Sequence, residues 1–141
     1  MRDVLRNVRR ARLQRSLSLL AGLSALPLAF EIYLEHYKGS FGDKWEWTPL
    51  VLTPPLLAAG IAGALPGGER VARTALPATG ALYALNGLAG VVLHARGVAR
   101  KPGGFAEPTY NLVMGPPLLA PGSLALVGGM AMAAGLMRRE A

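Results

Sequence analysis

Two histidines are the side chains of this sequence best suited to hold a ligand. His36 and His94 are its only histidines, and each is followed at the same spacing by a basic residue and a glycine. Imidazole nitrogen ligates haem iron, zinc, copper and non-haem iron. We therefore expect haem b or a transition metal to bind between the two rings. The alternative is that each histidine lies half solvated at a membrane surface, where the basic residue contacts lipid headgroups.

Two carboxylates precede the first histidine. Glu31 and Glu35 lie four residues apart, which separates their side chains by about 40° around a helix. Because an ionisable group inside a membrane span is costly, both are candidate metal ligands, proton-handling groups or halves of ion pairs. We expect Glu31 to face the neighbouring helices, and Glu35 to reach water or Lys38. The candidate partners of Glu31 are Arg96, Arg100 and Asn86.

The segment that follows the second histidine is basic and rich in turn-forming residues. Arg96 and Arg100 stand within residues 95–111, which are numerous enough to fold over the mouth of a helical bundle as a lid. Their guanidinium groups are suited to bind a haem propionate, another anion or a lipid phosphate. The sequence contains no cysteine, which excludes disulfides and thiolate ligands.

The elements that must position these residues are apolar segments long enough to cross a membrane. Only 16% of the residues are charged, against about 25% in soluble domains. A span needs about 20 mostly apolar residues, and residues 47–68, 74–93 and 108–137 carry no charge. We predict an all-α membrane four-helix bundle, kinked at its prolines. Its spans are predicted at about 16–37, 48–65, 74–94 and 112–137.

The two halves of the sequence resemble each other. Segments 49–60 and 111–122 share eight of twelve residues, including a Pro-Pro pair, and residues 15–39 align without a gap to residues 73–97. This alignment pairs His36 with His94. A repeat of two spans returns the chain to its starting side, so we expect two duplicated hairpins related by a pseudo-two-fold axis along the membrane normal. Such an axis would place the two histidines on opposite sides of a shared centre.

Lysine and arginine predict the orientation in the membrane. Ten of the fifteen fall in residues 1–15, in residues 66–73 and after residue 137, whereas five fall on the opposite side. The richer side is usually cytoplasmic. We therefore predict a multi-pass protein of the cell (inner) membrane with both termini in the cytoplasm. Asn86, in the middle of the third span, is expected to hydrogen-bond to a neighbouring helix.

The N-terminal residues form a basic arm. Residues 1–15 contain six arginines, with apolar residues at helical spacing between them. We expect a short amphipathic helix on anionic headgroups, or a frayed basic tail, ahead of a single transmembrane domain at residues 16–141. Although the net charge is +7, the cations lie at the ends of apolar segments. Lipid is therefore the expected partner, and nucleic acid is not.

No motif identifies a substrate or a reaction. The first interpretation is a small subunit of a larger membrane complex, which carries a haem or metal at His36 and His94 as an electron-transfer anchor, or which serves assembly alone. The alternative is a small proton-coupled transporter that acts as a homo-oligomer, with Glu31 in the proton path. An enzyme that acts alone is not expected, because the sequence suggests no nucleophile–base pair.

Overall fold

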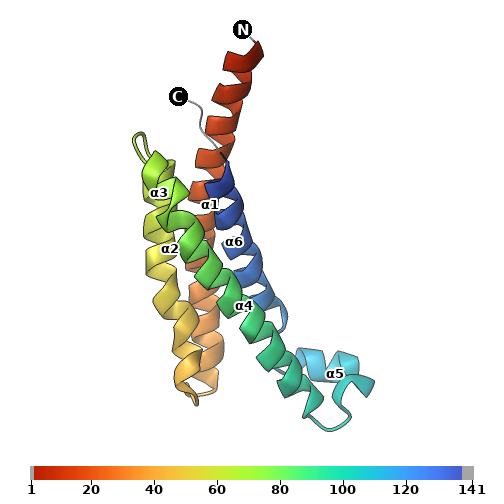
Figure 1. Ribbon diagram of the computed structural model, residues 1–141. Helices are drawn as coiled ribbons and strands as arrows, with labels where there is room; N and C mark the ends of the chain where they lie inside the picture. Colours follow the sequence, from red (N-terminus) through yellow and green to blue (C-terminus); the bar gives the residue numbers. More distant parts are fainter. Residues whose placement is uncertain (1, 138–141) are drawn as a thin grey trace.

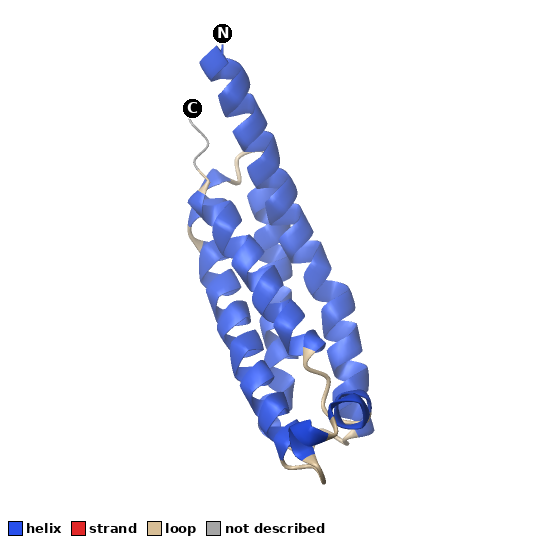
Figure 2. Cartoon of the chain, turned by 90° about the vertical axis from the view of Figure 1, so that its right-hand side faces the viewer, coloured by secondary structure: helices blue, strands red, loops and turns tan. Residues whose placement is uncertain are grey.

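The computed structural model describes residues 2–137 of the chain, with the side chains of residue 9 and of residues 11–137. All its regular elements are helices (Figures 1 and 2). In chain order they are α1 (Arg2–Lys38), η1 (Lys44–Trp47), α2 (Thr48–Ala64), α3 (Glu69–Arg73), α4 (Ala75–Ala99), η2 (Gly104–Ala106), α5 (Pro108–Val113) and α6 (Leu119–Leu136).

Four of the described segments are long and apolar enough to cross a membrane, which confirms the predicted number of spans. They cover Ala11–Lys38, Lys44–Ala64, Glu69–Ala99 and Leu119–Leu136. In the bundle, α1 and α4 each pack against both α2 and α6, so α1 and α4 lie diagonally opposite each other. The N-terminal part of α1 and the end of α6 lie at one end of the bundle (Figure 1). We call this the proximal end, and the opposite end, which carries residues 39–47 and 100–118, the distal end.

The N-terminal arm is not separated from the first span. α1 runs without a break from Arg2 to Lys38, where a separate surface segment was expected up to residue 15. Residues 2–21 contain neither glycine nor proline, so no residue in this stretch interrupts the helix. Arg15 lies beside Glu69 of α3, with 3.8 Å between the nitrogen and the oxygen. The arm therefore extends beyond the proximal end as a continuation of α1 (Figure 1).

The fourth predicted span, residues 112–137, is wrong in its first part. α5 ends at Val113, residues 114–118 are not helical, and α6 begins at Leu119. Gly115 is followed by Pro116 and Pro117, and a residue that precedes proline is disfavoured in the helical conformation. The equivalent Pro-Pro pair of the first half lies inside the unbroken α2. The same dipeptide thus interrupts one helix and is accommodated in the other.

Glycines allow the helices of each hairpin to approach closely. A Cβ on Gly60 of α2 would lie 2.6 Å from the carbonyl oxygen of Ser18 in α1, and 2.7 Å from the Cα of Gly22. A Cβ on Gly80 of α4 would lie 2.8 Å from the carbonyl oxygen of Gly128 in α6. Small residues at contacts of this kind are typical of membrane helix pairs, because association there depends on close packing.

The two hairpins pack in different registers. In the sequence repeat Gly80 corresponds to Gly22, and Gly122 corresponds to Gly60. Gly80 nevertheless packs against Gly128, while a Cβ added to Gly122 would meet no atom within 4 Å. The similarity of the two halves in sequence is therefore not matched by the same helix contacts.

Substitution of a contact glycine should destabilise the bundle. We expect Gly60→Ala to lower the free energy of unfolding by about 1–3 kcal/mol, because the new methyl group overpacks the α1–α2 contact. Gly129→Ala is the matched control, since a Cβ there meets no atom within 4 Å. The control should be neutral or stabilising by up to about 1 kcal/mol through its higher helix propensity. Denaturant unfolding in detergent measures both variants, and equal stability would contradict this packing.

Candidate functional site

Both histidines belong to the faces of α1 and α4 that point into the bundle. His36 follows the buried Ala25 by eleven residues, and His94 follows the buried Tyr83 by eleven residues. Eleven residues make about three helical turns, so side chains at this spacing point in nearly the same direction. Ala25 and Tyr83 are themselves equivalent in the repeat. The two halves therefore direct their histidines inward from corresponding positions.

The structure brings the two imidazole rings together at the distal end. The ring centroids of His36 and His94 are 6.5 Å apart, and the ring planes stand at 81° to each other. Both residues are half-buried. Because α1 and α4 are diagonal in the bundle, the two rings meet between the two hairpins. This is the juxtaposition that the sequence repeat predicts.

His94 is oriented by the broken fourth span. Its Nδ1 lies 2.7 Å from the carbonyl oxygen of Pro117. A carbonyl only accepts hydrogen bonds, so Nδ1 carries the proton and donates it, and the lone pair of the neutral ring is on Nε2. Helical N–H groups do not reach this carbonyl, because Pro117 precedes the N-cap residue of α6 and the residue four positions later is Pro121. The histidine and the carbonyl thus satisfy each other.

His36 has a different environment. Its Nδ1 is buried, and no hydrogen-bond partner for it is found within residues 2–137. The ring packs edge-on against Phe41, with the centroids 6.0 Å apart. A buried polar atom without a partner is unusual in a native structure and calls for an explanation. A bound ligand at the histidine pair would provide one.

The structure separates the two carboxylates from the histidine pair. Glu31 is exposed, so the expectation that it faces the neighbouring helices is wrong. The reason is helical geometry, because Glu31 lies about 140° around the helix from His36. Glu35 accepts a hydrogen bond from the Nζ of Lys38, as expected. The described residues contain no group of three or more histidine, aspartate and glutamate side chains that could hold a metal ion.

The two arginines also lie away from the pair. Arg96 follows His94 by two residues, which is about 200° around the helix, and Arg100 is likewise off that face. Both are exposed, and within the described residues neither forms an ion pair with Glu31. Asn86, the third candidate partner of Glu31, has its Nδ2 donating to the Oγ1 of Thr48, 2.7 Å away. The predicted hydrogen bond from Asn86 to another helix is thus confirmed, as a link from α4 to α2.

The segment after α4 is held beside that helix. Asn111 is 1% exposed, and its Nδ2 donates to the carbonyl oxygens of Pro102 at 3.0 Å and Gly104 at 2.7 Å. η2 and α5 lie next to the distal end of α4, away from the turn between α1 and α2 (Figure 1). The segment therefore does not cover both hairpins, as a lid over the mouth of the bundle would.

The sequence did not reveal an aromatic cluster around His36. Ser40 and Phe41 have positive φ angles of 59° and 47°, which are uncommon for residues other than glycine. This turn brings Phe41 back against His36 and stacks it on Trp47 at 4.0 Å between centroids. Tyr33 also packs against Phe41. The spacing of these residues in the sequence carries no signal for the cluster.

A buried hydrogen bond between α2 and α4 was also missed. Tyr83 is fully buried, and its hydroxyl lies 3.2 Å from the Oγ1 of Thr53. Since the hydroxyl hydrogen of Thr53 is donated to the carbonyl oxygen of Pro49, Tyr83 is the donor to Thr53. Tyr83 is the only aromatic residue outside residues 30–47 and 105–110. That isolated position is the sequence signal that could have distinguished Tyr83 from the other aromatic residues.

No protein-family model matches the chain, and no curated protein or solved structure is significantly similar to it.

The tautomer of His94 can be checked directly. In metal-free protein at neutral pH we expect the Nδ1–H form of His94, because the carbonyl oxygen of Pro117 requires a donor. Nitrogen-15 NMR of the two imidazoles distinguishes the tautomers, and a His36→Gln variant assigns the signals. An Nε2–H tautomer of His94 would contradict the hydrogen bond described here.

Proposed function

We propose that the chain is a multi-pass membrane subunit that holds a haem or a transition-metal ion between His36 and His94. The observation that carries the proposal is the edge-to-face pair of imidazoles, 6.5 Å apart, at the distal end. His94 has its Nδ1 engaged by a carbonyl, which is the usual way in which a protein orients a metal-ligating histidine. His36 supplies a buried nitrogen without a partner.

The ring separation favours ligands on opposite sides of one metal. A metal lies about 2.0 Å from a ligating imidazole nitrogen and hence roughly 3.2 Å from the ring centre. Two rings on opposite sides would then be about 6.4 Å apart, and two rings at a tetrahedral angle about 5 Å. The observed 6.5 Å is close to the first value. The described residues contain no group of three or more histidine, aspartate and glutamate side chains that could hold a metal ion. The pair would therefore suit a group that needs only two protein ligands, such as haem or cuprous copper, more than a zinc ion that needs three or four.

This arrangement suits electron transfer. Haem iron or copper held by His36 and His94 would supply a group that changes oxidation state. A carrier of this kind needs a donor and an acceptor, so we place the chain in a larger membrane complex. The chain would span the cell membrane with its arginine-rich proximal end on the cytoplasmic side. Anionic headgroups would meet the basic arm there.

The test is an absorption spectrum and a metal analysis of protein purified from membranes in mild detergent. We expect a Soret band or near-stoichiometric copper or iron, together with co-purifying membrane partners. In a His36→Ala, His94→Ala double variant, the amount of haem or metal bound per protein should fall at least about tenfold, because both ligands are removed. Glu31→Gln is the control that leaves the pair intact and should retain the group.

Two results would contradict the proposal. The first is wild-type protein that is colourless and metal-free, and that takes up neither haemin nor cuprous ion. The second is equal metal content in the wild-type protein and the double histidine variant.

A further inference from the structure

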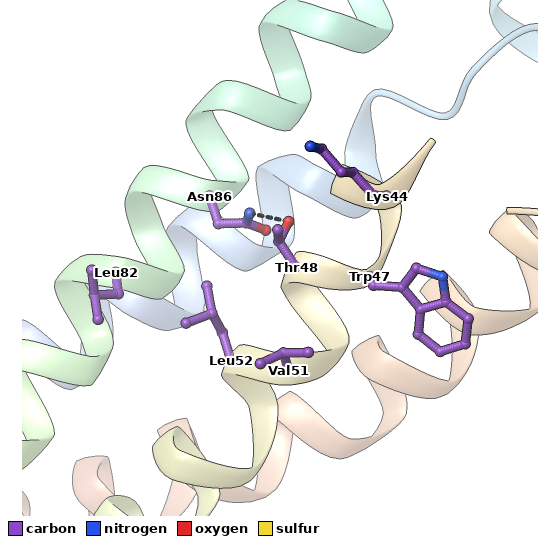
Figure 3. Close-up of a pocket in the computed structure, with 7 residues that line it drawn as sticks. All are labelled: Lys44, Trp47, Thr48, Val51, Leu52, Leu82 and Asn86. Carbon is purple, nitrogen blue, oxygen red and sulfur yellow. Dashed lines mark hydrogen bonds between the residues drawn. The ribbon is translucent and has the colours of Figure 1, made fainter. Parts of the chain in front are cut away.

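A cavity of about 410 Å³, open to the surface of the bundle, lies between α2 and α4 in its distal half. Its volume is within the range of small-molecule sites, roughly 300–1,000 Å³. Val51, Leu52 and Leu82 form its apolar side (Figure 3). Val51 and Leu82 are among the exposed apolar residues of the spans. A ligand that enters here would therefore come from the bilayer and would have an apolar tail.

Polar groups gather at the other side of the cavity. Lys44, Thr48 and Asn86 lie close together there (Figure 3). The Oγ1 of Thr48 accepts from Asn86 and donates to the carbonyl oxygen of Trp45, 2.6 Å away. The second N–H of the Asn86 amide is not used in this bond, and no group of the described residues donates to its Oδ1. The side chain can thus offer one donor and one acceptor to a ligand.

We propose that this cavity binds the head group of an isoprenoid quinone. A quinone carbonyl would accept a hydrogen bond from Asn86 or Lys44, and the hydroxyl of the reduced quinol would donate to the Oδ1 of Asn86. An amide suits both oxidation states because it donates and accepts. A phospholipid fits less well, since its anionic phosphate only accepts and the single lysine is flanked in sequence by Asp43 and Glu46.

Aromatic rings connect the cavity to the histidine pair. Trp47 lines the cavity and stacks on Phe41 at 4.0 Å. Phe41 is 6.0 Å from His36, which is 6.5 Å from His94. A bound quinone would thus be linked through Trp47 and Phe41 to the redox group of the proposed function, and this role of the site rests on that function. The binding itself depends only on the cavity.

The binding experiment uses tryptophan fluorescence, because quinones quench it and Trp47 lines the cavity. A short-tailed benzoquinone is titrated into wild-type protein in nanodiscs of neutral lipid, and we expect saturable quenching. Asn86→Leu, which removes the polar group, and Leu82→Phe, which fills the cavity, should each weaken binding about tenfold or more. Leu85→Phe is the matched control, since Leu85 is 63% exposed on α4 and does not line the cavity. It should bind as the wild type does.

Several outcomes would overturn the quinone site. The first is quenching that does not saturate, and the second is equal quinone affinity in all three variants. The third is recovery of fluorescence when anionic phospholipid is added, which would assign the cavity to phospholipid. The same titration on the His36→Ala, His94→Ala variant separates the two proposals. Saturable binding there supports the quinone site even if no metal is ever found, whereas metal-loaded protein that fails to bind quinone overturns this inference alone.

Discussion

The hydrogen bond between His94 and the carbonyl oxygen of Pro117 is the contact on which the distal end of the bundle depends. A backbone carbonyl that is partly buried and lies outside a helical hydrogen-bond ladder needs a donor from elsewhere in the protein. The Gly115–Pro117 segment breaks the fourth span and leaves this carbonyl without a helical N–H. His94 supplies the donor at 2.7 Å. One bond thus compensates for the helix break, attaches α4 to the linker before α6, and sets the tautomer of the ring that faces His36.

Corresponding residues of the two halves of the chain have different structural surroundings. In α2, Thr53 precedes the Pro-Pro pair and bonds both Pro49 and Tyr83, and the helix continues through the prolines. In the second half glycine replaces that threonine, and the helix is interrupted. The equivalent histidines consequently differ, because one is oriented by a carbonyl and the other has a buried nitrogen without a partner. The two imidazoles, which stand at corresponding positions of the sequence repeat, thus have different surroundings.

The sequence predicted the four apolar helices and the meeting of His36 with His94, because lipid allows few backbone structures and the repeat relates the two residues. The sequence also contained enough information to place Glu31 outside the interior of the bundle, since a side chain about 140° around the helix from an inward-facing histidine must point outward. The break at residues 114–118 was not predictable from the Pro-Pro pair, which occurs in both halves. The turn at Ser40 and Phe41 was not predictable either, because neither of the two residues with positive φ angles is a glycine.

The ends of α1 and α4 meet at their histidines across the diagonal of the bundle. Because the chain contains no cysteine, this contact can be tested in native membranes with a His36→Cys, His94→Cys pair and a short bifunctional thiol reagent. The structure predicts an efficient cross-link within one chain, and none in a His36→Cys, Leu65→Cys pair, because Leu65 lies at the proximal end. Failure of the first pair to cross-link, with both cysteines shown to be reactive, would contradict the account.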